Sequence, residues 1–227
     1  MPLRTSLLTL ALALALMLIL PLAVHAQTRV TGPELEVYLN REVSDWRLEG
    51  DSKVESRMNR LGLRVRDRVG DNLWIGIHGG YLELTQSGNP VTQGMDLGGW
   101  YLGSSARWRF VEVGPASLSL LGQYTYNEAD DTLGDQTTRY TWHEYGAGLE
   151  SGFTMDALRI RLGVDYTGVD GDEKSSGPVQ RTLSLAEEES VTARAALDLL
   201  VDATGRITIQ VETGARRGAG IWFARQF

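Results

Sequence analysis

Apolar and polar residues alternate one by one through most of this 227-residue chain. Successive side chains of a β-strand point to opposite faces, so a period of two predicts strands with one apolar and one polar face. In the segment 116–126, Leu118, Leu120 and Tyr124 fall on one face, whereas Ser119 and Gln123 fall on the other. The same pattern recurs from residue 34 to residue 227 and predicts an all-β protein.

The alternating segments are separated by turn and loop residues, and they predict ten antiparallel strands. An even number returns both ends of an up-and-down barrel to the same side. Eight strands is the alternative, if an element of the first or the last hairpin is irregular. The predicted strands are 34–42, 53–67, 72–84, 97–111, 116–127, 138–153, 157–167, 188–201, 205–213 and 218–227.

The predicted connections alternate in length along the chain. Short turns on one side and long loops on the other are typical of outer-membrane β-barrels. The short turns are predicted near 67–71, 113–115, 154–156 and 202–205, and the long polar loops near 42–52, 85–94, 128–137 and 168–187.

The polar faces carry charges of both signs in mid-strand, which suits a barrel interior filled with ion pairs. An unpaired charge in a narrow lumen is very costly, so these side chains are expected to pair. The simplest interpretation is a network that fills and stabilises the barrel, and the functional alternative is a small charge-selective path. The predicted lumen network consists of Glu34, Glu36, Arg60, Arg64, Arg66, Arg159, Arg161, Asp165, Arg194, Asp198 and Glu212.

The aromatic residues gather near the two ends of the predicted strands. Two aromatic girdles at the two membrane interfaces give this distribution in barrels that span a bilayer. The set next to the long loops is Tyr81, Tyr124, Tyr126, Tyr140 and Tyr166, and the set next to the short turns is Trp108, Phe110, Phe153, Phe223 and Phe227.

The segment 216–227 is rich in aromatic residues and ends on Phe227. It resembles the C-terminal signal of bacterial outer-membrane β-barrels, whose polar, glycine, apolar and aromatic positions match Arg216, Gly218, Ile221 and Phe223 here. The resemblance implies a transmembrane antiparallel barrel in the outer membrane of a Gram-negative bacterium. It also implies membrane lipid, lipopolysaccharide and the barrel-assembly machinery as partners.

Residues 1–26 have the features of a secretory signal peptide. Arg4 supplies the positive charge, an apolar run covers 7–20, and Val24-His25-Ala26 offers small residues for cleavage. An uncleaved membrane anchor is the alternative, but the run is shorter than the roughly 20 residues that a spanning helix needs. We therefore expect a cleaved signal peptide at 1–26 and one barrel domain at 27–227.

Composition and charge exclude several classes of function. The chain has no cysteine, which excludes disulfides, thiol chemistry and a lipoprotein anchor. Its net charge is −7 and no basic stripe is present, which argues against nucleic-acid binding. No motif for a cofactor occurs, and the acidic residues Asp170 and Asp172 lack the spacing of a calcium loop, so they are interpreted as solvated charges.

Two histidines, His78 and His143, follow the predicted signal peptide. A catalytic base needs an acid that orients it, but neighbouring strand residues such as His143 and Glu144 point to opposite faces. A pairing of His78 with Glu144, Asp130 or Asp131 has no motif behind it. We predict no catalytic, cofactor or metal residue.

The expected function is therefore non-enzymatic: membrane integrity, surface interaction or restricted passage of small solutes. One alternative is an outer-membrane hydrolase or acyltransferase with a histidine at the rim. Another is a soluble periplasmic β-barrel that binds an apolar ligand, because alternation alone does not tell which face is inside.

Overall fold

The computed structural model of the chain describes residues 32–50 and 52–227. The predicted signal peptide lies outside these residues. The described residues form eleven β-strands, and they contain no helix that is long and apolar enough to cross a membrane. The strands are β1 (Glu34–Leu48), β2 (Ser52–Val69), β3 (Leu73–Ser87), β4 (Leu97–Val113), β5 (Ala116–Leu133), β6 (Gln136–Met155), β7 (Leu158–Ser176), β8 (Arg181–Glu187), β9 (Val191–Leu200), β10 (Gly205–Gly214) and β11 (Arg216–Gln226).

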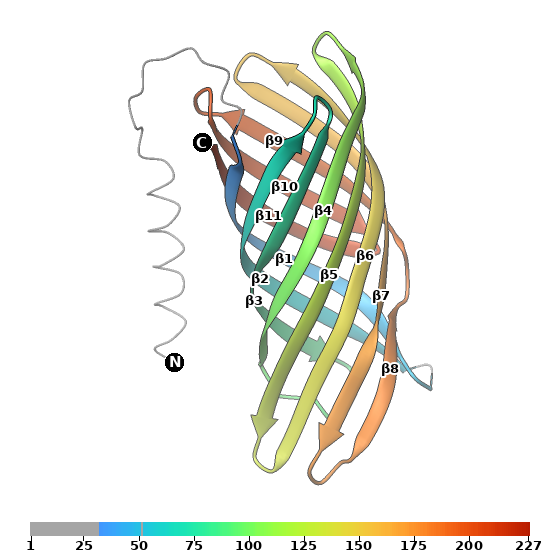
Figure 1. Ribbon diagram of the computed structural model, residues 1–227. Coiled ribbons are helices and arrows are strands. Elements are labelled where there is room, and N and C mark those ends of the chain that lie inside the picture. Colours follow the sequence, from blue (N-terminus) through green and yellow to red (C-terminus); the bar gives the residue numbers. More distant parts are fainter. Residues whose placement is uncertain (1–31, 51) are drawn as a thin grey trace.

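The strands form a closed antiparallel barrel (Figure 1). The barrel closes where β11 pairs with β1, from Glu34 opposite Gln226 to Ser44 opposite Arg216. Closure leaves no free edge, so the backbone N–H and C=O groups of the wall pair with each other. The predicted all-β up-and-down barrel is confirmed. We call the end that holds Glu34 and Gln226 the terminal end, and the opposite end the hairpin end.

The barrel narrows from its terminal end to its hairpin end. β8 and β9 follow each other along the same edge of β7, and β8 also pairs with β1. In the described residues, the ring at the terminal end consists of β1 to β7, β9, β10 and β11, which makes ten strands. The β10–β11 hairpin turns at Gly214, so at the hairpin end β8 fills the gap between β7 and β1 and leaves eight. The chain thus has eleven strands, one more than the ten predicted, because the segment 181–187 of a predicted loop forms β8.

The strands at the hairpin end are longer than predicted. The predicted loops at 42–52, 128–137 and 168–187 are largely strand, whereas the loop predicted near 85–94 is present and covers residues 88–96. Polar residues on both faces look like loop in the sequence, but the ladder of backbone hydrogen bonds does not depend on the side chains. Hence β5 and β6 stay paired up to Leu133 and Gln136, as the long hairpins of Figure 1 show.

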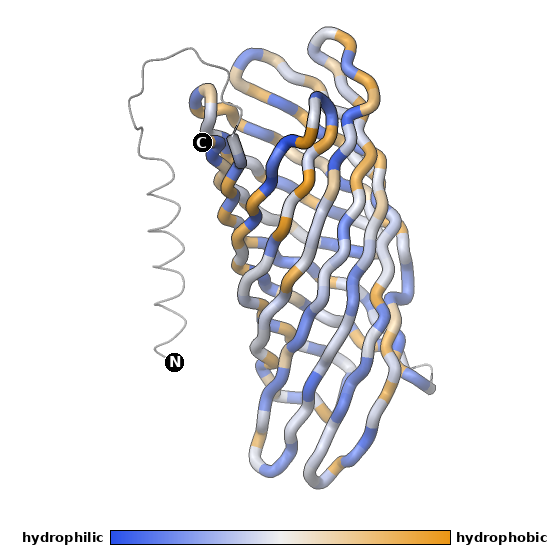
Figure 2. The backbone as a smooth tube through the Cα atoms, in the orientation of Figure 1, coloured by the Kyte–Doolittle hydropathy of each residue, from blue (hydrophilic) through white to orange (hydrophobic). Residues whose placement is uncertain are grey.

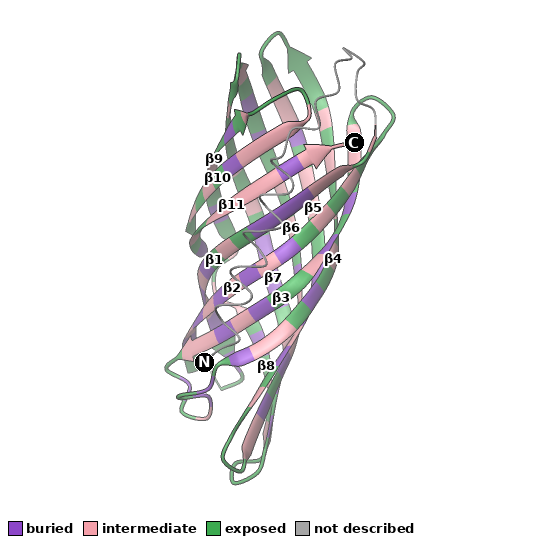
Figure 3. Cartoon of the chain, turned by 90° about the vertical axis from the view of Figure 1, so that its left-hand side faces the viewer, coloured by how far each residue is buried: buried purple, intermediate pink, exposed green. Residues whose placement is uncertain are grey.

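The apolar faces of the strands point out of the barrel. Ile77 is 63% exposed, and Leu162 and Val164 are similarly exposed. Together with their counterparts on the other strands, they form a belt around the half nearer the terminal end, whereas the hairpin end is mainly hydrophilic (Figure 2). Along the strands of the belt, exposed residues alternate with residues of intermediate or complete burial (Figure 3), among them the charged residues of the lumen. The lumen behind this belt is polar, which argues against the alternative of a soluble barrel with an apolar ligand inside.

Aromatic side chains border the belt on both sides. Tyr81, Tyr124 and Tyr166 are exposed at the edge toward the hairpin end, where the structure adds Trp100 and Tyr145. Trp108, Phe110 and Phe153 are exposed at the other edge. The prediction for Tyr140 was wrong, because this residue falls on the inward face of β6 and is completely buried.

Candidate functional site

The lumen contains a polar cavity of about 210 Å³ in the half nearer the terminal end. This volume has room for several water molecules. The residues that line the cavity come from the strands of the ten-stranded ring. Its charged side chains are arginines and carboxylates at alternate strand positions. From the terminal end to the hairpin end, the lumen therefore contains three levels. They are the cavity, a charged layer that borders it, and an apolar plug.

At the terminal end, three arginines share two glutamates. Arg66 and Arg206 bind Glu34, and Arg64 binds Glu36 with 2.9 Å between Nη1 and Oε1. Arg206 also lies 3.3 Å from Glu36. These residues come from β1, β2 and β10, so the cluster joins strands on both sides of the β1–β11 closure.

A second cluster lies deeper in the cavity, around Glu150. Arg107, Arg161 and Arg194 all approach its carboxylate, at 2.8, 3.0 and 3.3 Å. Arg161 also donates two hydrogen bonds of 2.8 Å to Asp198. Bidentate pairs of this kind fix the orientation of the guanidinium as well as its charge.

At the end of the cavity nearer the hairpin end, two buried arginines bind three glutamates. Arg216 binds Glu144 and Glu187 at 2.9 Å each and Glu42 at 3.3 Å. Arg60 pairs with Glu42 and Glu144 from the other side. We call these five residues the waist cluster. Since Glu187 is the last residue of β8 and Arg216 the first of β11, the cluster lies where the wall changes from ten strands to eight.

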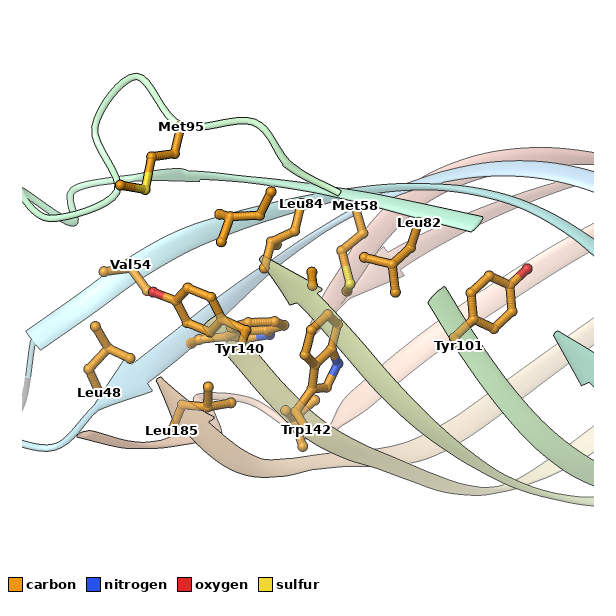
Figure 4. Packing of buried hydrophobic residues seen from close by; sticks show 14 of the residues in the cluster. Leu48, Val54, Met58, Leu82, Leu84, Met95, Tyr101, Tyr140, Trp142 and Leu185 are labelled. Atoms are coloured by element: carbon orange, nitrogen blue, oxygen red, sulfur yellow. The ribbon is translucent and has the colours of Figure 1, made fainter. Parts of the chain in front are cut away.

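An apolar plug fills the narrower end of the barrel (Figure 4). Trp46 and Trp142 meet edge to face with 5.4 Å between ring centroids, and both are fully buried. Protein interiors are close-packed, with few voids larger than a water molecule between buried side chains such as these. The other buried side chains of the cluster are Tyr38, Leu48, Val54, Met58, Leu82, Leu84, Met95, Leu97, Tyr101, Ala129, Tyr140, Val169 and Leu185.

The β3–β4 loop covers the plug from the hairpin end. Asn89 donates to Glu173 at 2.8 Å and to the hydroxyl of Tyr140 at 2.9 Å, while Met95 is buried in the plug. Arg181 completes the group by donating to Glu173 at 2.7 Å and to Asn89 at 2.9 Å. The loop is thus held by polar contacts to β6, β7 and β8.

Both titratable partners in this group lie beyond the exposed belt, and their pKa values are shifted. Burial alone raises the pKa of Glu173, but hydrogen bonds from Arg181, Tyr140 and Asn89 outweigh it, so the pKa lies below its ordinary value. Burial and the neighbouring Glu173 carboxylate raise the pKa of Tyr140. Glu173 is therefore charged at neutral pH while Tyr140 stays a neutral donor.

The predicted network residues all point into the barrel. Ten of them line the cavity, and Glu34 lies next to it, bound to Arg66 and Arg206. Asp165 is 3.5 Å from Arg194. Within the described part of the chain, Arg159 and Glu212 form no salt bridge; Arg159 donates to Thr154 and Glu212 accepts from Gln210.

Sequence analysis missed several members of the network. Their charges fall on the same inward positions as the predicted ones, so the period of two contains the signal. Glu42 and Glu187 fall at the boundaries of predicted loops, where inward and outward positions are not distinguished, whereas Glu144 lies within the predicted strand 138–153 and shares a face with Glu150. The missed residues are Glu42, Arg107, Glu144, Glu150, Glu187, Arg206 and Arg216.

The two histidines lie on opposite sides of the wall. His78 is buried in the lumen with Nε2 3.0 Å from Thr125 Oγ1, and His143 faces outward with Nδ1 2.6 Å from the Tyr124 hydroxyl. No carboxylate among the described residues hydrogen-bonds either ring. Neither histidine therefore has the orienting acid that a catalytic base requires.

The residues of the predicted assembly signal lie on the strand that closes the barrel. Ile221 and Phe223 fall on the outward face of β11, opposite Leu39 and Val37 of β1. Gly218 lies so close to β1 that an added Cβ would be 2.3 Å from the Arg41 carbonyl oxygen. Arg216 points inward to the waist cluster, and Phe227 follows the strand, with its N–H donating to the Pro33 carbonyl.

No protein-family model and no curated protein matches this sequence. Among solved structures, the chain is similar to the translocator domain of the autotransporter NalP from Neisseria meningitidis, with 11% identity, a TM-score of 0.53, and coverage of 89% of this chain and 90% of that chain. It is also similar to the outer membrane protease OmpT from Escherichia coli, with 8% identity, a TM-score of 0.55, and coverage of 89% and 99%. At these identities the likeness concerns the fold alone, which is that of outer-membrane β-barrels.

Proposed function

We propose that this chain is an integral outer-membrane β-barrel of a Gram-negative bacterium with a closed lumen and a non-enzymatic role in membrane integrity and surface interaction. The observation that carries the proposal is the exposed apolar belt around a closed barrel with a polar interior. A continuous apolar surface of this kind marks contact with lipid or a partner, and a closed barrel satisfies its backbone polar groups inside a bilayer.

The different connections at the two ends of the barrel support one orientation of the barrel across the membrane. The connections at the terminal end are short turns, and the paired hairpins at the hairpin end extend beyond the belt. Outer-membrane barrels have short periplasmic turns and longer extracellular connections. The terminal end accordingly faces the periplasm, and the long β5–β6 and β7–β8 hairpins present a polar surface to the outside of the cell.

The plug argues against free passage of solutes. Trp46, Trp142 and their neighbours fill the narrow end, and the β3–β4 loop lies over them. A solute that crosses this barrel would have to displace both the buried aromatic side chains and the loop. The closed lumen therefore favours a structural or surface role over the restricted passage that remained open from the sequence.

Three arginines at the seam of the barrel offer contacts to lipid phosphate. Arg57 and Arg217 flank Val43 on the outward face, and Arg41 lies two residues before Val43 on the same strand. Arg57 and Arg217 also lie near Glu55, at 3.3 and 3.8 Å. The group lies just beyond the apolar belt, where lipopolysaccharide carries phosphates, and guanidinium groups bind phosphate well. We assign lipopolysaccharide as the lipid partner of this face.

The closing strand β11 is assigned to recognition by the barrel-assembly machinery. Its outward residues Ile221 and Phe223 sit next to β1, so they become part of the wall only when the barrel closes. Export through the predicted signal peptide remains part of this proposal.

The test combines a gel assay with conductance. In outer-membrane fractions, the unheated protein should migrate differently from the boiled protein in SDS, because closed barrels stay folded until heated. In planar bilayers, the wild-type barrel should show no stable conductance, whereas a Trp46→Ala, Trp142→Ala double variant should conduct. Absence of the heat shift would overturn the barrel assignment, and steady conductance of the wild type would overturn the closed lumen.

A further inference from the structure

A hollow interrupts the apolar belt near the terminal end of the barrel. It has a volume of about 330 Å³ and lies on the outer surface of β4 to β7, next to the β4–β5 turn. Its lining is mainly apolar, and the hydroxyl of its outward-facing serine, Ser151, already donates to the Leu162 carbonyl at 3.3 Å. The hollow therefore offers a ligand apolar surface rather than hydrogen-bond donors.

Two small residues form the floor of the hollow. In the β5–β6 ladder, Ala116 is opposite Phe153, and Leu118 is opposite Ser151. All four side chains face outward, with the two small ones on one diagonal and the two large ones on the other. A trough thus passes over Ala116 and Ser151, between Leu118 and Phe153. It runs from the β4–β5 turn toward Leu162, which is opposite Ser151 on β7.

A β-bulge shapes the side of the hollow that β4 forms. The β4–β5 register shifts between Arg109 and Val111, so Phe110 has no partner and Val111 is opposite Leu118. Without the extra residue, the larger Phe110 would be opposite Leu118 and would lie beside the hollow. Bulges redirect side chains in this way and are common next to functional sites. The irregularity of β4 thus keeps this side of the hollow open.

The surroundings of the hollow determine what can fill it. Leu162 belongs both to the hollow and to the exposed belt, so the hollow is continuous with the surface that the proposed function places in lipid. A second barrel would approach with a convex wall, which leaves a hollow between the two surfaces unfilled. Atoms that line an unfilled space lose dispersion contacts, so a narrow apolar chain that enters from the terminal end fits best.

We propose that the hollow binds one acyl chain of a phospholipid of the periplasmic leaflet, with the headgroup of this lipid next to the β4–β5 turn. Inside a bilayer, association of this kind depends on close packing and not on the release of water, and small residues permit the close approach. The inference deepens the proposed function, on which it rests, by giving the belt a bound lipid in the leaflet opposite to lipopolysaccharide.

The first test counts the phospholipids that stay on the barrel. The full barrel is refolded in vesicles of phosphatidylethanolamine and phosphatidylglycerol, transferred to a mild detergent and analysed by native mass spectrometry. The wild type should keep one phospholipid. Ala116→Leu fills the hollow and should lower the lipid-bound fraction about tenfold, which corresponds to about 1.4 kcal/mol of lost contacts. Ala193→Leu, the same change at an exposed alanine of β9 opposite Val164, is the matched control and should keep the lipid.

The second test locates the lipid on the wild type. A phospholipid with a photoreactive group in its acyl chain should label residues 111–118 and 151–162 more strongly than the rest of the belt. Labelling in proportion to exposed area all around the belt would overturn the site. This result decides even if Ala116→Leu does not fold.

The outcomes separate the two proposals. If the gel shift is present but the wild type keeps no phospholipid, the lipid site is wrong and the barrel stands. The same holds if Ala116→Leu keeps as much phospholipid as the wild type. If the wild type is a dimer in detergent that Ala116→Leu separates, a second copy fills the hollow and the lipid site is wrong. A wild-type protein without a gel shift contradicts the barrel, and the lipid site with it.

Discussion

At the scale of single residues, Arg216 connects four strands of the wall. Its guanidinium binds glutamates from β1, β6 and β8, and its own strand closes the barrel. Its side chain is 6% exposed, so its three partners have little access to water. Removing one member of a buried ion cluster leaves uncompensated charge, which costs more than the cluster itself contributes.

We therefore expect Arg216→Met to lower the free energy of unfolding by about 3–5 kcal/mol. Urea unfolding of the refolded barrel in lipid vesicles measures this change. Arg217→Gln, at the next position but with an exposed side chain, should change it by only about 0–1 kcal/mol. Equal losses in the two variants would contradict the role of the waist cluster.

Glu173 makes the stability of the β3–β4 loop dependent on pH. Its pKa is lowered in the folded protein, so its contribution to loop stability is complete at neutral pH. The contribution begins to fall once the pH drops below the ordinary glutamate pKa, and it is lost below the folded-state pKa. Hydrogen-exchange protection of the Val91 and Met95 N–H groups, which donate to Asn89 Oδ1 and to the Thr92 carbonyl, should accordingly decrease in acid, after correction for intrinsic exchange rates.

Glu173→Gln should weaken this protection at neutral pH and flatten its pH dependence, because the amide cannot hold Arg181 by charge. Glu189→Gln, which changes an exposed glutamate between β8 and β9, should keep the wild-type profile. A pH dependence that survives in Glu173→Gln would assign it to another group.

At the scale of elements, the feature that shapes the barrel is the exchange of partners along β1. Up to Ser44 this strand pairs with β11, and from Trp46 to Leu48 it pairs with β8. The Glu188 N–H donates to the Asp45 carbonyl at the crossover. The switch lets a ten-stranded ring continue as an eight-stranded one without exposing a strand edge, and the smaller circumference is what the plug fills.

Engineered cysteines test this exchange, because the chain has none of its own. Arg47 and Ala186 are opposite each other in the β1–β8 ladder and both face outward. Opposed strand residues lie within the Cα range of a disulfide, so Arg47→Cys with Ala186→Cys should cross-link readily on mild oxidation.

The matched control is Arg47→Cys with Arg217→Cys. Arg217 is opposite Val43, four residues away along β1, which is too far for a disulfide. The two pairs are compared by the mobility of the oxidised protein on a non-reducing gel. Preferential cross-linking of the control would mean that β11, and not β8, runs beside the end of β1.

At the scale of the whole molecule, the wall separates two environments of opposite polarity. Outward residues of the belt are apolar, and inward residues at the same height are charged and paired. In water this arrangement would expose a large apolar surface. In a bilayer it places the apolar outer face in lipid and keeps the polar inner face in the lumen. The stability of the barrel should therefore depend on the depth at which a charge is added to its exterior.

Leu162 lies in the middle of the outward face of β7, between Ile160 and Val164. We expect Leu162→Arg to destabilise the barrel in vesicles by about 2–4 kcal/mol, as a charge near the bilayer midplane does. Asp170→Arg, on the same outward face but beyond the belt, should cost about 0–1 kcal/mol. Equal costs from urea unfolding would contradict the position of the belt.

Much of the wall was predictable because a period of two is a local property of the chain. The alternation of Leu158, Ile160 and Leu162 with Arg159 and Arg161 identifies a strand and its two faces without knowledge of its neighbours. Each of the ten predicted strands has a counterpart in the structure, and the predicted network residues all point inward. The ends were less accurate, because segments such as 128–137 carry polar residues on both faces and no alternation marks them as strand.

The sequence by itself therefore determined an all-β chain of about ten strands and which residues share a face. The C-terminal signal and the aromatic residues already predicted that the apolar face is the outer one, and the structure confirmed it. The tertiary structure alone decided which charged side chains meet in the lumen and that β8 replaces the β10–β11 hairpin beside β1. The physical reason is that these features depend on barrel closure, which brings distant positions such as Glu34 and Arg206 into contact. Local alternation records two faces, but only the closed ring determines which charges meet in the lumen.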